Sequence, residues 1–281
     1  MKSRRNFLKT ASLTLGASGL FPFVNTASPI SGDAAKESGK MLEMGMAGYT
    51  FNQFSIEQTI SMMNRVGVTM LSLKEFHLPL NSTQEKANEV IAAFKMGGIT
   101  IYAVGVIYMK DKAEVDRAFE YAKKVNVTLI IGVPEYELLP YTEEKVKATG
   151  IRIAIHNHGP EDKRYPGPKD VYDRIKNMDP KMGLCLDIGH AIRAGADPAK
   201  AVVDYNQRMF DLHIKDVSKA AQDGKAIELG RGVIDLPALV KALRKINYAG
   251  KSSIEFEKDM KDPLPGIAES VGFYRGVMKS T

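Results

Sequence analysis

The sequence predicts an α/β fold, and within that class a (β/α)8 TIM barrel. Eight short apolar runs recur along the chain, and longer amphipathic segments separate them. Alternation of strands with helices calls for a parallel sheet, and eight such units close naturally into a barrel. A doubly wound open sheet is the alternative, but no glycine-rich phosphate loop follows the first run, which disfavours it.

The predicted strands are short apolar runs such as ITIYAVGVI and VTLIIGV. In chain order they cover residues 42–49, 70–77, 99–107, 127–133, 151–158, 182–188, 209–215 and 251–257.

Three of the intervening segments carry helix signals at their ends. SIEQTISMMNRVG opens with Ser55 as an N-cap and closes with Gly67 as a C-cap. KAEVDRAFEYAKKVN has acidic residues in its first half and lysines at its end, as the helix dipole favours. DLPALVKALRKINYAG begins with Asp235 as a cap and Pro237 in the first turn. These segments are therefore predicted to be helices between strands.

Residues 1–31 have the anatomy of an export signal, with a basic start, an apolar segment and small residues after it. The motif SRRNFLK resembles the twin-arginine signature. An amphipathic helix or a short membrane anchor is the alternative, although the apolar part is shorter than the ~20 residues of a spanning helix. Residues 32–40 are a polar linker, which leaves 41–281 as a single domain. We expect a periplasmic protein with no stable membrane span.

The charge balance argues against a nucleic-acid partner. The chain carries a net charge of +6, but Lys2, Arg4, Arg5 and Lys9 all precede the first acidic residue, Asp33. Without those four, the remaining basic residues nearly balance the 33 acidic ones. The single cysteine, Cys185, excludes an internal disulfide and is expected to be a buried small side chain.

Ionisable side chains fall on the inward face of the last four barrel strands, at their C-terminal ends. Side chains alternate along a strand, and barrel enzymes place their chemistry at the C-terminal rim. Buried charges are costly unless they are paired or bind a metal. Imidazoles and carboxylates together suit Mn, Co, Fe, Ni or Zn. We therefore predict a divalent metal site; its candidate ligands are His156, Asp187, His213 and Glu255.

The motifs LCLDIGHA, DLHIKD, ELGRGVIDLPALVKAL and SIEFE resemble the last strands of the xylose isomerase-like TIM-barrel family. That family includes sugar isomerases and epimerases, inosose dehydratases and an endonuclease branch. The resemblance implies metal ligation by Asp187, His213 and Glu255. His156 stands where a glutamate is common in the family. His190 matches the family histidine that contacts substrate hydroxyls.

Other inward or rim residues have predicted roles in proton transfer and substrate binding. His158 is the first choice for the general acid/base, because an imidazole titrates near neutrality, and a second metal ligand is its alternative role. Glu257 is a competing base. Lys215 is placed to stabilise an enolate oxygen, or else to pair with Asp216 or another acid. The predicted substrate-binding residues beside His190 are Lys74, His77 and Arg231, and Glu135 is an unassigned rim carboxylate.

These features together predict a metal-dependent sugar isomerase or epimerase that abstracts a proton next to a sugar carbonyl. A lyase or dehydratase acting on keto-sugars or 3-keto-glycosides by β-elimination is the first alternative. A non-catalytic carbohydrate-binding barrel is the second. The expected partner is a small carbohydrate, and assembly into a homo-oligomer is left open.

Overall fold

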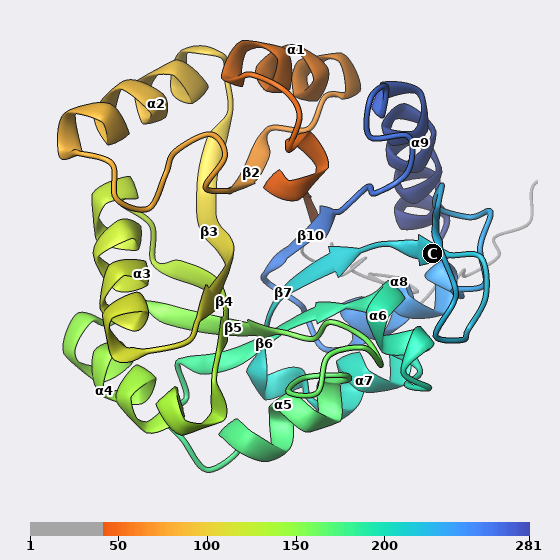
Figure 1. The fold of residues 1–281 in the computed structure, drawn as a ribbon. Coiled ribbons are helices and arrows are strands. Elements are labelled where there is room, and N and C mark those ends of the chain that lie inside the picture. The colour runs from red at the N-terminus through yellow and green to blue at the C-terminus, as the bar shows by residue number, and fades with distance from the viewer. Residues whose placement is uncertain (1–41) are drawn as a thin grey trace, which may run out of the picture. The chain divides into compact units, whose positions relative to one another are not determined.

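A computed structural model describes residues 42–281, in which eight parallel strands form a closed barrel. The strands follow the order β1-β10-β7-β6-β5-β4-β3-β2 around the barrel, and the helices surround it (Figure 1). This arrangement confirms the predicted (β/α)8 TIM barrel. The predicted export signal (1–31) and linker (32–40) lie outside the described residues.

All eight predicted strands are present, although several end earlier than expected. Their bounds are β1 Glu43–Ala47, β2 Met70–Leu73, β3 Thr100–Met109, β4 Leu129–Pro134, β5 Arg152–His156, β6 Met182–Asp187, β7 Met209–Ile214 and β10 Lys251–Ile254.

Strand β5 ends before His158 because the chain leaves the sheet there. The backbone N–H of His158 donates to the Tyr165 carbonyl, which belongs to the loop that follows the strand. Strand β2 likewise stops four residues before its predicted end at residue 77, and β10 stops three residues before its predicted end at residue 257. The final residues of these runs therefore form the rim of the barrel rather than its wall.

The predicted helix caps are confirmed. The hydroxyl of Ser55 accepts from the backbone N–H of Gln58, and Gly67 ends the helix with a left-handed φ of 65°. Asp235 caps its helix in the same way. The helices are α1 Ile56–Val66, α2 Gln84–Met96, α3 Lys112–Val125, α4 Leu139–Thr149, α5 Pro168–Ile175, α6 Ile188–Arg193, α7 Pro198–Asp204, α8 Leu236–Lys245 and α9 Leu264–Ser280, with 3-10 turns η1 Gly48–Phe51, η2 Tyr136–Leu138 and η3 Asn206–Arg208.

The aliphatic side chains of the strands form the core, as their alternation predicts. Each fully buried side chain of this size contributes about 1.5–3 kcal/mol relative to exposure. Representative members, all at most 1% exposed, are Ile153, Ile155, Leu184, Leu186, Leu212 and Ile254.

Strand β3 is irregular where it approaches the rim. Its pairing register with β4 shifts between Gly105 and Ile107. Gly105 has a φ of 131°, and a Cβ there would lie 2.0 Å from the carbonyl oxygen of Ile131. Only glycine fits this conformation and this close approach. The strand then continues to Met109, two residues beyond its predicted end.

A short antiparallel pair, β8 (Asp216–Val217) and β9 (Ala226–Ile227), follows β7 and was not predicted. The buried carboxylate of Asp216 accepts hydrogen bonds from the backbone N–H groups of four residues, which are Val217, Gly230, Gly232 and Ile234. A Cβ on Gly232 would lie 2.1 Å from Oδ1 of Asp216, so glycine is required there. The Asp216 side chain thus joins the start of this segment, at β8, to the loop that follows β9.

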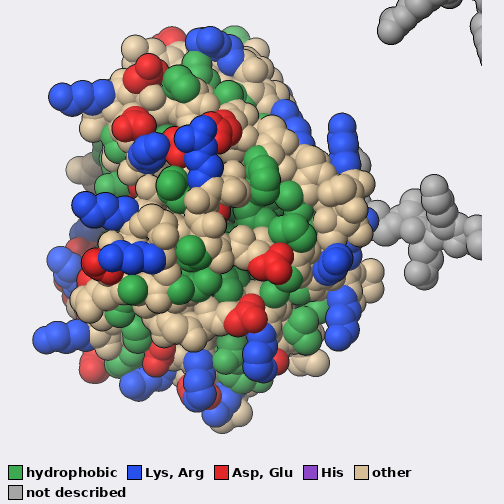
Figure 2. Space-filling view, turned by 90° about the vertical axis from the view of Figure 1, so that its right-hand side faces the viewer, with side chains coloured by type: hydrophobic (Ala, Val, Ile, Leu, Met, Phe, Trp, Pro, Cys, Tyr) green, Lys and Arg blue, Asp and Glu red, His purple; other side chains and the backbone are tan. Residues whose placement is uncertain are grey.

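The surface carries charges of both signs. On the face shown in Figure 2, Lys and Arg side chains of the described residues stand among Asp and Glu side chains rather than in one basic groove. Within residues 42–281, no helix is both long enough and apolar enough to cross a membrane.

Candidate active site

The four predicted metal ligands come together at the C-terminal end of the barrel. His156 ends β5, Asp187 ends β6, His213 lies in β7 and Glu255 follows β10 directly. One donor atom from each lies within 4.8 Å of the others, and all four side chains are buried. Strand register accounts for this, because Asp187 pairs with His213 and His156 pairs with Cys185.

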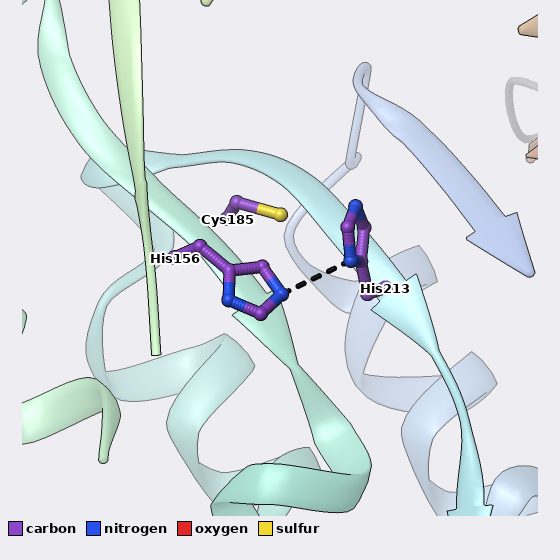
Figure 3. A group of neighbouring side chains, drawn as sticks. All are labelled: His156, Cys185 and His213. Carbon is purple, nitrogen blue, oxygen red and sulfur yellow. Dashed lines mark hydrogen bonds between the residues drawn. The ribbon is translucent and has the colours of Figure 1, made fainter. Parts of the chain in front are cut away.

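The donor atoms point toward one another. Nε2 of His156 lies 3.0 Å from Nδ1 of His213 (Figure 3) and 3.6 Å from Oδ2 of Asp187. The same Nδ1 of His213 lies 3.3 Å from Oε2 of Glu255. Oδ1 of Asp187 accepts the backbone N–H of His190, whereas Oδ2 faces Nε2 of His156 and lies 3.2 Å from the Lys215 ammonium. Oδ2 therefore points into the cluster, as a ligand atom would.

Lys215 lies inside the same cluster. Its Nζ is 2.8 Å from Glu255, 3.2 Å from Asp187 and 3.1 Å from Glu257, and its side chain is only 3% exposed. Of the two roles considered for Lys215, ion pairing is therefore present, although with these three acids rather than with Asp216.

The charge of this cluster fits a divalent metal. Burial alone would raise the pKa values of Asp187 and Glu255, but the Lys215 ammonium and the neighbouring histidines together outweigh it and hold both well below their usual range. Despite burial, Cys185 and Glu255 hold the pKa of His213 well above its usual range. With Glu257 ionised and His213 neutral, as a metal ligand must be, three carboxylates face one ammonium, which leaves a net charge of −2. A buried net charge is unfavourable unless a counter-ion neutralises it. Two imidazoles and two carboxylates are also a donor set typical of transition metals and zinc.

A cavity of about 230 Å³ opens above the cluster. Six of the predicted site residues line it, among them Lys74, whose Nζ donates to the Val106 carbonyl at 2.6 Å. Glu257 is 31% exposed, and burial raises its pKa despite the opposing effect of Lys215. The full lining is Tyr49, Lys74, Val106, Tyr108, His156, His158, His190, Glu255 and Glu257.

Both ring nitrogens of His158 have partners. Its Nδ1 lies 3.3 Å from Nδ1 of His156, and its Nε2 lies 2.8 Å from the hydroxyl of Tyr108. Burial, and then repulsion from His156, lower the pKa of His158 to about 3. His158 is therefore tied to the ligand His156 and is a weak base in this arrangement.

His190 is also held by hydrogen bonds. Its Nδ1 accepts from Arg193 at 3.1 Å, and its Nε2 lies 3.4 Å from the Lys215 ammonium. Burial lowers the pKa of His190 to about 4. Arg193 and Lys215 are both cationic donors, so the ring faces a donor at each nitrogen, and the nearby ammonium disfavours its protonation.

Two predicted substrate-binding residues do not reach the cavity. His77 is buried, with Nε2 3.2 Å from the Thr59 hydroxyl and 3.1 Å from the Phe54 carbonyl, because β2 ends at Leu73 and the chain turns away. Arg231 is exposed and forms a two-bond ion pair with Glu269. The glycines on either side of Arg231 donate their backbone N–H groups to the Asp216 carboxylate. The rim carboxylate Glu135 pairs with Arg164 at 2.7 Å.

The aromatic walls of the cavity were not predicted. Tyr49 lies in the 3-10 turn η1, and Tyr108 lies one residue past the predicted end of its strand. The place of Tyr108 directly after the predicted strand 99–107 is the signal that the sequence offered for it.

Cys185 is buried, as predicted, and burial raises the pKa of its thiol to about 12. Its Sγ points toward the rings of His156 and His213 (Figure 3), and these three residues also bring donor atoms within 4.8 Å of one another. A protonated thiol at this position fills space beneath the two imidazoles.

Comparison with known families agrees with this geometry. Residues 66–277 match the model of the xylose isomerase-like TIM barrel family. The chain belongs to this family. Its members include sugar isomerases, epimerases and dehydratases, so the resemblance drawn from the strand motifs is confirmed.

Individual relatives are distant. An inosose dehydratase of Lacticaseibacillus casei is 26% identical over 41% of this chain and 44% of its own length. The chain thus aligns with less than half the length of the curated relatives it matches. Among solved structures, the E. coli 3-keto-D-glucoside 4-epimerase YcjR has a TM-score of 0.68 at 18% identity over 84% of this chain and 99% of its own. The IOLI protein, solved with a zinc atom, has a TM-score of 0.72 at 16% identity over 85% and 99%.

Proposed function

We propose that this protein is a metal-dependent sugar isomerase or epimerase that removes a proton from the carbon next to a sugar carbonyl. The observation that carries the proposal is the cluster of His156, Asp187, His213 and Glu255 at the floor of a cavity that also exposes a carboxylate. The zinc atom in the related IOLI structure and the sugar substrate in the name of the epimerase support it.

Glu257 is the base that the contacts favour. It lines the cavity, is partly exposed, and is held 3.1 Å from Lys215. His158, the first choice from the sequence, has both nitrogens engaged. In the proposed reaction the Glu257 carboxylate takes the carbon-bound proton, and the electron pair moves to the carbonyl oxygen to give an enediolate. Return of the proton to the opposite face epimerises the carbon, and its return to the neighbouring carbon isomerises the sugar.

The remaining residues of the cavity bind and orient the sugar. The Lys215 ammonium lies beside Glu257 and is placed to stabilise a developing oxyanion, and the ring of His190, which lines the cavity, is placed to bind a sugar hydroxyl. His156, Asp187, His213 and Glu255 would hold the metal, and a bound divalent metal supplies Lewis-acid stabilisation of adjacent substrate oxygens.

Deuterium exchange tests this proposal. The metal-loaded protein is incubated in deuterated water with keto-sugars and keto-glycosides, and NMR follows deuterium at carbon. The Glu257→Gln variant should lower exchange by about 10²–10⁴-fold while retaining metal. Glu269→Gln is the matched control, because Glu269 is an exposed carboxylate paired with Arg231. Unchanged exchange in Glu257→Gln would eliminate Glu257 as the base.

A lyase or dehydratase is the second candidate function. Three inosose dehydratases are among the relatives, and a probable 3-DHS dehydratase shares the fold. The same enediolate expels a leaving group β to the carbonyl, so the site serves either outcome. Release of water or of an aglycone in the exchange experiment would identify a lyase, and deuterium at an inverted carbon would identify an epimerase.

We further propose that the chain is exported through its twin-arginine motif and acts in the periplasm. That location disfavours sugar phosphates as substrates and favours free sugars, oxidised sugars or glycosides. Replacing Arg4 and Arg5 by lysine should retain the full-length protein in the cytoplasm of a bacterial host. Equal periplasmic amounts of both forms, measured by fractionation, would contradict this route.

A further inference from the structure

We propose that the hydroxyl of Tyr108 donates a hydrogen bond to a substrate oxygen. A chain of hydrogen bonds, from the metal ligand His156 through His158 to Tyr108, orients that hydroxyl; we call this chain the relay. Tyr108 is 42% exposed, lies one residue before the end of β3 at the rim and lines the cavity. Neither the strand pattern nor the family motifs assign it a role. The inference rests on the proposed metal-dependent function.

The donors and acceptors along this hydrogen-bond chain can be assigned starting from His156. Its Nε2 faces His213 and Asp187, at 3.0 and 3.6 Å, so Nε2 is the atom available to the metal. A neutral imidazole that ligates through one nitrogen carries its proton on the other. Nδ1 of His156 therefore carries the proton and donates to Nδ1 of His158, 3.3 Å away.

The next two steps follow from the same rule. Since Nδ1 of His158 accepts, the neutral ring carries its proton on Nε2. That Nε2–H then donates to the oxygen of Tyr108, 2.8 Å away. The tyrosine oxygen accepts this bond, so its own O–H is left to donate to another group. Burial raises the pKa of Tyr108, which keeps the phenol protonated.

The surroundings hold the Tyr108 ring in place. The centroid of the His158 ring lies 5.3 Å from that of Tyr108, and the Arg164 guanidinium lies 5.5 Å from the Tyr108 centroid. Arg164 is itself fixed by ion pairs with Glu135 and Asp162. The hydroxyl is therefore presented to the cavity by a ring with little freedom, as expected of a group that orients substrate.

Nitrogen-15 NMR of the histidine rings tests the relay without turnover. In the full chain loaded with Zn²⁺, we expect His158 to carry its proton on Nε2 and His156 on Nδ1. His158→Ala should weaken Zn²⁺ binding by about 10–100-fold, as loss of a group that orients a ligand does. Tyr108→Phe should leave Zn²⁺ affinity unchanged. A proton on Nδ1 of His158 in the zinc-loaded protein would overturn the inference.

Turnover tests the role of the hydroxyl. Tyr108→Phe should slow deuterium exchange by about tenfold, the effect of one lost hydrogen bond, for the keto-sugar that the wild type exchanges fastest. Tyr141→Phe is the matched control, because its hydroxyl bonds Asp116 on the outer helices. Exchange equal to wild type in Tyr108→Phe would overturn the inference. If the wild type exchanges no carbon-bound proton of any sugar, the proposed function fails. The histidine tautomers measured by NMR still test the hydrogen-bond relay in that case.

Discussion

Replacing Lys215 by methionine should destabilise the metal-free protein and make its stability depend strongly on a divalent cation. The Lys215 ammonium is 3% exposed and contacts Asp187, Glu255 and Glu257 within 3.2 Å. Its removal leaves three carboxylates together in a buried site. Breaking a buried ion pair by removing one partner typically costs about 3–5 kcal/mol, which is a large part of the 5–15 kcal/mol that stabilises an ordinary domain.

The added cation should reverse much of this loss. A divalent ion replaces the missing positive charge, so the variant should bind Zn²⁺ more tightly than the wild type and gain more stability from it, by RT ln(1 + [Zn²⁺]/Kd). Urea unfolding, measured with chelator and with Zn²⁺, gives both free energies. Lys219→Met is the control: its pair with Asp223 is exposed, so the expected change is about 0–1 kcal/mol. A Lys215→Met protein as stable as wild type in chelator would refute the reasoning.

Three further predictions concern the ligand set and the frame around it. Asp187→Asn should lose most bound zinc, measured by elemental analysis, and wild-type metal content would remove Asp187 from the ligands. Gly105→Ala should cost more than about 3 kcal/mol of unfolding free energy, because its Cβ would lie 2.0 Å from the Ile131 carbonyl, whereas Gly98→Ala, with open space around it, should cost about 1 kcal/mol. Burial lowers the pKa of His77, so stability should fall as pH drops below about 6.5, by at most about 1.4 kcal/mol per pH unit, and His77→Gln should flatten that fall in urea titrations.

The barrel and the ligand cluster could be predicted because both depend on alternation. Outward aliphatic residues and inward ionisable residues in the last four strands follow a period of two, and parallel register then brings equivalent positions to one level. His156, Asp187 and His213 lie at or near the ends of neighbouring strands, so alternation alone placed them together.

The remaining parts of the site depend on departures from that regularity. Tyr108 reaches the cavity from a strand whose register shifts at Gly105, and no pattern in the sequence specifies such a shift. His158 is oriented by a loop hydrogen bond to Tyr165 rather than by the strand. The charge balance around Lys215 arises from three segments far apart in the chain, so its partners require the folded structure.

The hydrogen bonds that the Asp216 carboxylate accepts explain why a GRG motif stands at residues 230–232. The two glycines around Arg231 are needed because their amides close on one buried carboxylate, and Arg231 itself faces solvent. A GRG motif in this place therefore reports how the loop is built and carries no information about the sugar. Substrate preference among relatives should instead be sought at positions equivalent to Tyr49, Tyr108 and His158, whose side chains line the cavity.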